Sequence, residues 1–255
     1  MRKRSKVVLG IDVGATGIKG ALVDVKKGEM ITERIKYPTP KPATPRQVFK
    51  VIQRIVEDLE WKDKTIGIGF PAIIKHGVSH SAANIDDKFL GYNIERSLKK
   101  KLSKKLVVLN DADAAGIASM TYGVGKRNQK KDVIILLTLG TGIGSAVFLH
   151  GRLLPNTELG HLKFRNSVAE KYASNSAREA KHESYETWAK DLDEVLKYYD
   201  FIFSPDLFII SGGVSKKYDR YEEYLSLKDK IVPAQLLNNA GIVGAACAAY
   251  KLFGN

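Results

Sequence analysis

Two segments of the chain repeat one pattern, in which an apolar run leads into a glycine-rich turn and a second apolar run. The first reads VVLGIDVGATGIKGALVDV, residues 7–25, and the second reads VIILLTLGTGIGSAVFL, residues 133–149. Short apolar runs bounded by glycine turns are typical of β-strands. A dinucleotide-binding G-x-G-x-x-G must open a helix, whereas a strand follows each turn here. The pattern therefore predicts two β-hairpins and argues against a Rossmann nucleotide-binding unit.

Helices and further strands alternate after each predicted hairpin. Apolar residues at helical spacing predict helices over residues 48–59, 94–102, 112–120, 188–199 and 241–253. Apolar runs predict strands over residues 31–39, 65–70, 106–111, 144–154 and 207–213. This order predicts an α/β protein built from two similar halves with a cleft between them, and the boundary is expected within residues 112–130.

Composition excludes several classes of protein. The 255 residues are 44% hydrophobic, which is enough for a substantial core. The single cysteine, Cys247, excludes a disulfide framework and a cysteine-based zinc site, and its alanine-rich surroundings predict a buried apolar role. The longest uncharged stretch, residues 133–151, is interpreted as strand and turn because of its glycines and threonines. Without a secretion signal or a membrane span, we expect a cytoplasmic protein.

The chain is strongly basic. Lys and Arg number 41 against 28 Asp and Glu, for a net charge of +13. Basic clusters occupy residues 2–6, 99–105 and 126–131. Two interpretations stay open: a solvated lysine-rich surface of the kind found in heat-adapted proteins, or a polyanionic partner bound by counterion release. Composition does not distinguish a nucleic acid from another polyphosphate.

The two glycine turns have the residues that a phosphate chain requires. Backbone amides of a tight turn converge on one point, and glycine leaves that point unobstructed. Asp12, at the end of the first strand, is suited to hold a hydrated Mg²⁺, and Lys19 could neutralise one phosphate charge. A single glycine-rich hairpin is usually only a hairpin, but two matching turns favour a shared ligand. The candidate phosphate-binding residues are Gly14, Ala15, Thr16 and Gly17 in the first turn, and Thr138, Gly140, Thr141, Gly142 and Gly144 in the second.

The pattern D-x-G-x-T-x-x-K at residues 12–19, together with LGTGIG at residues 139–144, resembles the actin-like sugar kinases and specifically the ROK family. The match continues in NDADAAG (110–116), NTELGH (156–161) and SGGVS (211–215), so it covers nearly the whole chain. The strings PNTELGHL, FSPDLFIISGGVSKK and LLNNAGIVGAA resemble the polyphosphate glucokinase branch of that family. The resemblance implies an actin-like, ribonuclease H-like fold. It implies a smaller N-terminal domain of residues 1–112 plus 238–255 and a larger C-terminal domain of residues 113–237.

The resemblance also implies roles for individual residues. Asn110 would bind the sugar, and Asp111 would be the catalytic base, since a carboxylate at the end of a strand can accept the proton of an attacking hydroxyl. Asp111 could instead cap the following helix, although Asp113 is the better cap candidate. The implied sugar ligands are Asn84, Asn110, Glu158, His161 and Glu170, and the implied further phosphate contacts are Gly212 and Gly213. Lys216 and Lys217 follow immediately, and our hypothesis is that they line the path of the phosphate chain; solvated surface lysines are the alternative interpretation.

The chain departs from most ROK kinases in one segment. Those kinases place a cysteine-rich zinc loop after the histidine, whereas residues 161–177 here read HLKFRNSVAEKYASNSA. His161 therefore lacks the cysteine partners of a zinc site, and no zinc is expected. His161 as a packed core residue and Glu170 as a helix-surface glutamate are the alternative interpretations.

The resemblance implies transfer of a phosphoryl group from inorganic polyphosphate to the 6-hydroxyl of glucose, with Mg²⁺ as cofactor. An ATP-dependent or dual-donor glucokinase or glucomannokinase is the nearest alternative. A sugar-responsive DNA-binding regulator is a remote one, because the first strand begins within ten residues and leaves no room for an added helix-turn-helix. We expect no nucleic-acid or membrane partner, and the resemblance implies a homodimer.

Overall fold

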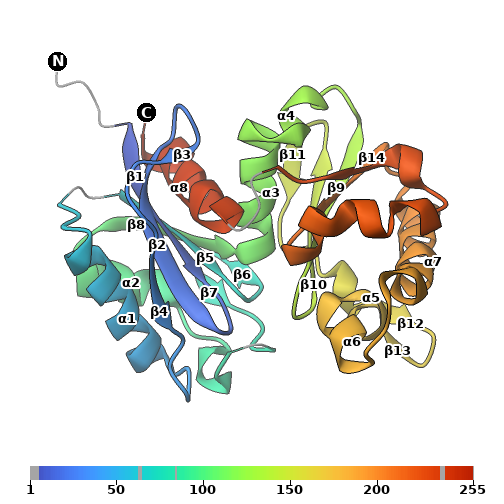
Figure 1. Ribbon diagram of the computed structural model, residues 1–255. Coiled ribbons are helices and arrows are strands. Elements are labelled where there is room, and N and C mark those ends of the chain that lie inside the picture. The colour runs from blue at the N-terminus through green and yellow to red at the C-terminus, as the bar shows by residue number, and fades with distance from the viewer. Residues whose placement is uncertain (1–5, 63–64, 84, 236–238, 255) are drawn as a thin grey trace. The chain divides into compact units, whose positions relative to one another are not determined.

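The computed structural model describes residues 6–62, 65–83, 85–235 and 239–254 (Figure 1). The chain forms two compact units, Met1–Ala118 with Asn239–Asn255, and Ser119–Asn238. Each unit contains one large mixed β-sheet. Within the described residues, no helix has both the length and the apolar composition needed to cross a membrane.

The sheet of the first unit has the strand order β3-β2-β1-β5-β8, with β4 also paired to β2. Strands β1 and β2 form the first predicted hairpin, and β1, β5 and β8 run parallel. A small hairpin, β6 with β7, follows β5. The bounds are β1 Val7–Val13, β2 Gly17–Asp24, β3 Glu29–Met30, β4 Ile35–Pro38, β5 Thr65–Phe70, β6 Ile74–Lys75, β7 Val78–Ser79 and β8 Lys105–Asn110.

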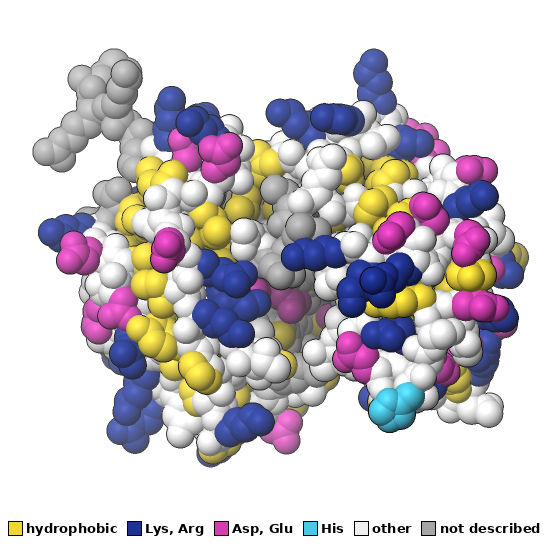
Figure 2. Space-filling view, viewed as in Figure 1, with side chains coloured by type: hydrophobic (Ala, Val, Ile, Leu, Met, Phe, Trp, Pro, Cys, Tyr) yellow, Lys and Arg dark blue, Asp and Glu magenta, His cyan; other side chains and the backbone are white. Residues whose placement is uncertain are grey.

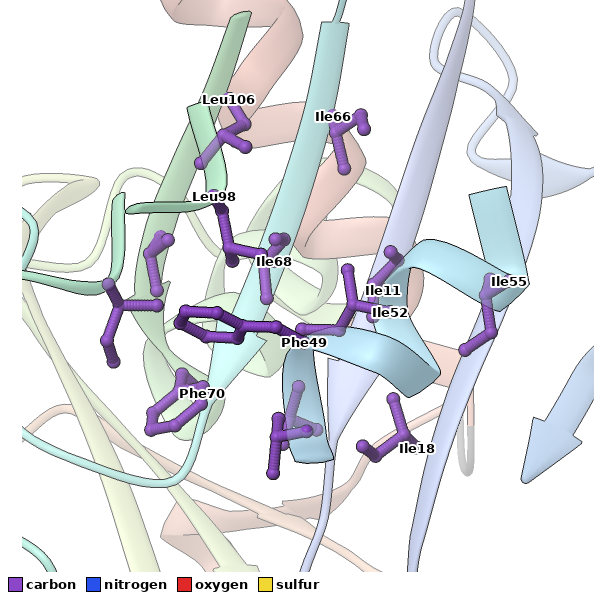
Figure 3. Close-up of a cluster of buried hydrophobic side chains, with 14 of the residues drawn as sticks. Ile11, Ile18, Phe49, Ile52, Ile55, Ile66, Ile68, Phe70, Leu98 and Leu106 are labelled. Carbon is purple, nitrogen blue, oxygen red and sulfur yellow. The ribbon is translucent and has the colours of Figure 1, made fainter. Parts of the chain in front are cut away.

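Helices α1 (Pro45–Asp58) and α2 (Ile94–Leu102) cover one face of this sheet. Thr44 caps α1 by accepting from the amide of Gln47, and proline occupies the first helical position, where its missing N–H costs nothing. Alternate residues of the strands meet the apolar stripes of the helices in one core (Figure 3). The side chains drawn there include Ile11, Ile18, Phe49, Ile52, Ile55, Ile66, Ile68, Phe70, Leu98 and Leu106.

Helix α8 (Ala240–Phe253) packs on the other face of the sheet at unusually short range. Gly10 and Gly67 are register partners on β1 and β5. A Cβ on Gly10 would lie 2.1 Å from the carbonyl oxygen of Ile242, and one on Gly67 would lie 1.8 Å from that of Ala245. Only glycine permits this backbone-to-backbone contact. Cys247 of α8 is buried, as its surroundings predict.

The second unit has the strand order β11-β10-β9-β14-β15. Strands β9 and β10 form the second predicted hairpin, and β9, β14 and β15 run parallel. One face packs against α5, α7 and η3, and the other against Met120 of α3 and Val124 of α4. The bounds are α3 Asp111–Tyr122, α4 Val124–Arg127, β9 Val133–Leu139, β10 Ile143–Leu149, β11 Arg152–Leu154, β12 Lys163–Phe164, β13 Ser167–Val168, α5 Glu170–Ala173, α6 Asn175–Ala180, α7 Tyr185–Phe203, β14 Leu207–Ser211 and β15 Ile231–Pro233. The 3-10 helices are η1 Asp87–Phe89, η2 Leu159–His161, η3 Gly213–Arg220, η4 Glu222–Tyr224 and η5 Lys228–Lys230.

The two sheets repeat one topology, β2-β1-β5-β8 and β10-β9-β14-β15, so the prediction of an α/β protein with two similar halves is confirmed. Four predicted strands differ in detail. In the predicted strand over residues 207–213, β14 ends at Ser211 and Gly213 begins η3. Residues 31–39 contain only β4, because the Thr32 hydroxyl takes the amide of Leu22 that a continuous strand would pair. Residues 144–154 divide into β10 and β11 at His150 and Gly151, which both have positive φ. Asp111 opens α3 instead of ending β8.

Candidate active site

The first glycine turn joins β1 to β2 through residues 14–16. The amide of Gly14 donates to the carbonyl of Gly17 at 3.0 Å, and the hydroxyl of Thr39 donates to the carbonyl of Gly14 at 2.5 Å. Ala15 and Thr16 are exposed, and no acceptor among the described residues pairs with their amides. The tip of this turn therefore presents two amide donors to solvent.

Asp12 on β1 and Lys19 on β2 are register partners close to this turn. Lys19 Nζ lies 3.2 Å from Asp12 Oδ2, and only 17% of the Asp12 side chain is exposed. A Cβ on Gly241 would lie 3.0 Å from the carboxylate carbon of Asp12, so this carboxylate lies against the first turn of α8. The positive end of the α8 dipole and Lys19 both stabilise a negative group here.

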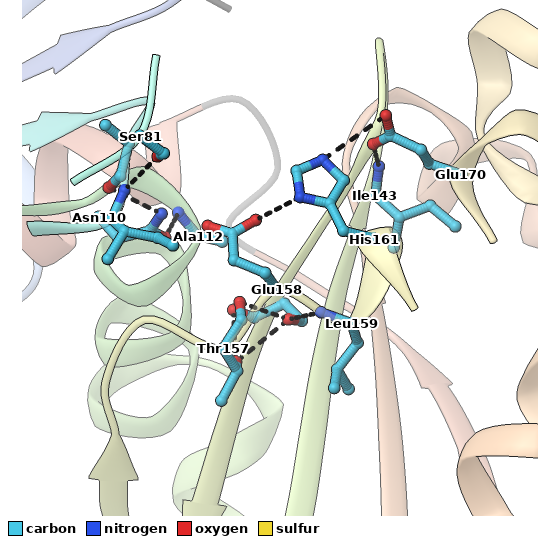
Figure 4. A network of polar contacts seen from close by, with 12 residues as sticks. Ser81, Asn110, Ala112, Ile143, Thr157, Glu158, Leu159, His161 and Glu170 are labelled. Atoms are coloured by element: carbon cyan, nitrogen blue, oxygen red, sulfur yellow. Dashed lines mark hydrogen bonds and ion pairs between the residues drawn. The ribbon is translucent and has the colours of Figure 1, made fainter. Parts of the chain in front are cut away.

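Asn110 and Asp111 join β8 to α3. The buried Asn110 caps α3, because its Oδ1 accepts from the amides of Ala112 at 2.9 Å and Asp113 at 3.1 Å, while its Nδ2 donates to the carbonyl of Ala72 (Figure 4). The expectation that Asp113 is the better cap is wrong, because Asp113 lies inside the first helical turn and receives the cap. With respect to the described residues, the one hydrogen-bonding position that Asn110 has left for a ligand is the second hydrogen of Nδ2.

These residues lie along one edge of the first sheet. Asp12 is the register partner of Gly69, and Gly69 is the partner of Leu109, directly before Asn110. Strands lie about 4.8 Å apart, so the backbones at Asp12 and Leu109 are separated by about 10 Å. The carboxyl ends of parallel strands are where open α/β sheets bind ligands. The first unit thus brings Asp12, the glycine turn, Asn110 and Asp111 to one edge.

The second glycine turn joins β9 to β10 through residues 140–142. The amide of Gly140 donates to the carbonyl of Gly142 at 3.0 Å, as at the first turn. Thr138 is the register partner of both Gly144 and Ser211, so three strands present one polar row beside the turn. Gly212 has φ +90°, and a Cβ there would lie 2.5 Å from the carbonyl oxygen of Leu139. The segment at Gly212 therefore contacts the end of β9 directly before the second glycine turn.

Glu170, the first residue of α5, lies against this turn. Its Oε2 accepts from the amide of Ile143 at 3.3 Å, and a Cβ on Gly142 would lie 2.3 Å from the same oxygen. The alternative of a helix-surface glutamate is wrong, since only 20% of the side chain is exposed. Because Gly142 has no Cβ, the Glu170 carboxylate can occupy this space.

His161 lies between two carboxylates. Its Nδ1 is 3.6 Å from Glu158 Oε2, and its Nε2 is 3.7 Å from Glu170 Oε1 (Figure 4). The imidazole is 44% exposed, so it is not a packed core residue. Burial raises the pKa of Glu158, His161 lowers it, and the charge of Glu170 raises it. These three side chains form a row of hydrogen-bonding groups suited to a polyhydroxyl ligand.

The backbone beneath Glu158 is fixed by buried polar groups that the motifs alone do not reveal. The Ser145 hydroxyl donates to the carbonyl of Thr157 at 2.7 Å and accepts from the amide of Leu159 at 3.0 Å. Tyr199 donates to the carbonyl of Leu159 at 2.7 Å. A Cβ on Gly160 would lie 2.2 Å from the carbonyl oxygen of Ile143. The only sequence signal for Ser145 is a hydroxyl at a buried position of an apolar strand.

Arg165 fixes the hairpin β12–β13, which connects His161 to Glu170. Its guanidinium donates to Asp191 at 2.7 Å and to Glu194 at 2.6 Å, both on α7. It also lies 5.1 Å from the ring centroids of Phe164 and Tyr172. Charge-assisted hydrogen bonds and cation–π contacts thus hold the segment that lies between His161 and Glu170.

Asn84, a candidate sugar ligand, lies outside the described residues. In the part of the chain that the structure describes, no three His, Cys, Asp or Glu side chains are grouped to hold a metal ion. A hydrated Mg²⁺ requires only one or two carboxylates with phosphate oxygens, and Asp12 fits that requirement.

Comparisons with known proteins match this architecture. The model of the ROK family matches residues 8–174. A polyphosphate glucokinase of Mycobacterium tuberculosis is 45% identical over 241 residues, which cover 94% of this chain and 90% of the relative.

Two solved structures share the fold. The inorganic polyphosphate/ATP-glucomannokinase of Arthrobacter sp. strain KM has a TM-score of 0.91 and 44% identity, covering 96% of this chain and 99% of that one. A ROK family glucokinase of Streptomyces griseus, solved with glucose and AMPPNP, has a TM-score of 0.80 and 23% identity, covering 96% and 99%. The resemblance inferred from the motifs is thereby confirmed: the chain belongs to the ROK family.

Proposed function

We propose that the protein transfers a phosphoryl group from inorganic polyphosphate to the 6-hydroxyl of glucose, giving glucose 6-phosphate. The observation that carries this proposal is the 45% identity to a polyphosphate glucokinase over 94% of the chain. The row of Glu158, His161 and Glu170 and the two glycine turns support it.

Asp111 is the catalytic base in this proposal. The glucose O6 attacks the terminal phosphorus of the donor, its proton passes to the Asp111 carboxylate, and the polyphosphate shortened by one unit leaves. A positioned base of this kind contributes about 10²–10⁴-fold to the rate. Asn110 donates its one remaining amide hydrogen to a sugar hydroxyl.

Glu158, His161 and Glu170 bind the other hydroxyls of glucose. Carboxylates accept hydroxyl hydrogens more strongly than neutral groups do, and the imidazole between them adds a further donor or acceptor. The buried support beneath Glu158, through Ser145 and Tyr199, keeps this row in place before glucose binds. Preorganisation of this kind lowers the cost of orienting the acceptor.

The glycine turns bind the donor. The amides of Ala15 and Thr16 and those of residues 140–142 contact phosphate oxygens, with Gly212 and Gly213 beside the second turn. Lys19 neutralises donor charge. Asp12 would hold a hydrated Mg²⁺, and the bound ion would neutralise negative charge on the phosphate oxygens.

The test is glucose 6-phosphate formation from purified protein, glucose, Mg²⁺ and nucleotide-free polyphosphate, followed by a coupled dehydrogenase. Product should accumulate in proportion to the enzyme, and the Asp111→Asn variant controls for contaminating kinases. A rate equal to the blank rejects the proposal.

A second candidate is a dual-donor glucomannokinase, favoured by the name and the 44% identity of the Arthrobacter structure. Parallel assays with ATP and polyphosphate, and with glucose and mannose, separate the two. By resemblance to the family we also propose a homodimer, which light scattering of the purified protein tests.

A further inference from the structure

Three cationic side chains of the second unit converge on one aromatic ring. The guanidinium carbon of Arg178 lies 4.5 Å from the ring centroid of Tyr185, and Lys217 Nζ and the guanidinium carbon of Arg220 each lie 5.8 Å from it. Tyr185 is stacked on the buried Tyr221, with centroids 6.0 Å apart. Cation–π attraction draws each cation to the ring but does not remove the repulsion among three like charges.

Among the described residues, one carboxylate is paired with the three cations: Arg178 Nη2 lies 3.5 Å from Glu179 Oε1. The Arg178 guanidinium also donates to Asn175 Oδ1 and to the carbonyl of Glu183. For Lys217 and Arg220, no carboxylate of the described residues lies within 4.0 Å of a charged nitrogen. Both side chains are exposed, so an anion from solution can reach them. In Figure 2, Lys and Arg side chains gather on the second unit over the orange segment that carries η3.

The cluster is connected to the second glycine turn by two elements. Helix α6 carries Arg178, and the amide of Ser176 in that helix donates to the carbonyl of Gly140 at 3.1 Å. Helix η3 carries Lys217 and Arg220 and begins at Gly213, next to the Gly212 that contacts Leu139. A 3-10 helix rises about 2 Å per residue, so Lys217 lies about 8 Å from Gly213, at the kink where η3 departs from helical φ and ψ.

We propose that Arg178, Lys217 and Arg220 form a subsite for the phosphate units of a polyphosphate chain that follow those held at the second glycine turn. A linear polyanion carries charge on every unit, so cations placed beyond the turn gain from counterion release. The contacts with Tyr185 bring these cations together from α6 and η3, so they meet a phosphate chain as one group. This subsite deepens the proposed function and rests on it.

The subsite makes the enzyme sensitive to the length of the donor. The test compares the double variant Lys217→Ala/Arg220→Ala with Arg152→Ala/Lys228→Ala, which removes the same two residue types from exposed positions of the second unit that lie outside the three basic clusters. The KM for long-chain polyphosphate should rise roughly tenfold in the first variant, and the slope of log KM against log salt should fall by about 0.7 for each lost phosphate contact. The KM for glucose should not change, and the control variant should resemble the wild type.

Calorimetric binding of long-chain polyphosphate and of tripolyphosphate, without glucose, supplies a readout that does not depend on turnover. The first variant should lose affinity for the long chain and keep its affinity for tripolyphosphate. Equal losses for both ligands, or equal behaviour of the two double variants, overturn the subsite. A wild-type protein that binds long polyphosphate but forms no glucose 6-phosphate refutes the proposed function and leaves the binding comparison decisive for the subsite.

Discussion

Substituting Gly142 by alanine tests whether the second turn also governs the sugar site. Gly142 is absent from the residues with positive φ, so alanine is compatible with its backbone. The added Cβ, however, would lie 2.3 Å from Glu170 Oε2, closer than any real contact. The carboxylate must therefore move away from the amide of Ile143 and from His161.

The size of the effect follows from what Glu170 loses. A hydrogen bond to a charged group contributes about 1.5–3 kcal/mol. A loss of this size in the transition state corresponds to a decrease of roughly 10–100-fold in kcat/KM for glucose, because 1.36 kcal/mol is about tenfold. The KM for polyphosphate should change much less, since the amides of the turn remain.

The decisive measurement is a double-mutant cycle with Glu170→Ala. In the Glu170→Ala background the Cβ at residue 142 meets no carboxylate. Adding Gly142→Ala to that variant should therefore lower kcat/KM for glucose by less than about threefold. Additive losses would refute the reasoning and would show that the methyl group acts through the phosphate turn. Unfolding in urea checks that each variant is folded.

Three further predictions concern the same site. Asp111→Asn should lower turnover by about 10²–10⁴-fold while calorimetry still detects glucose binding, and near-normal turnover would contradict its role as the base. Burial raises the pKa of the Glu158 carboxyl above its ordinary value of 4.5. As the pH falls through that raised pKa, the carboxylate is protonated and no longer accepts hydrogen bonds from the sugar. The KM for glucose should therefore begin to increase at a pH above 4.5. Glu158→Gln should abolish this acid limb, and an unchanged profile in the variant would assign the limb to another group. Ser145→Ala removes the acceptor of the buried Leu159 amide, so urea unfolding should show a loss of about 1–3 kcal/mol, accompanied by weaker glucose binding; a fully stable variant would exclude this support.

The elements that the sequence predicts are those with a strong period or a long apolar run. Strands β1, β5, β9 and β14 and helices α1, α2 and α8 fall where apolar spacing indicates them. The hairpins β6–β7 and β12–β13 have strands of two residues. Strands this short cannot show an alternation of apolar and polar residues. Hairpin β12–β13 is held by Arg165 through Asp191 and Glu194, contacts that become visible only after folding brings α7 beside it.

Motif matching located the candidate site residues but not the contacts among them. It named Gly142 and Glu170, yet nothing in the sequence places one against the other. Sequence inspection favoured Asp113 over Asp111 as the helix cap, whereas the structure uses Asn110. Ser145 is a single hydroxyl in an apolar strand, and Tyr199 is the second of two adjacent tyrosines in α7, so neither belongs to a recognisable motif.

The close packing of α8 affects the order in which the chain folds during synthesis. The strands that α8 covers are translated first, and all of residues 119–238 leave the ribosome before α8 does. Until α8 is translated, the backbone at Gly10 and Gly67 therefore stays uncovered in the nascent first unit. The second unit is continuous in sequence and can fold before that point. Translation of α8 then covers the open face of the first sheet and completes the first unit.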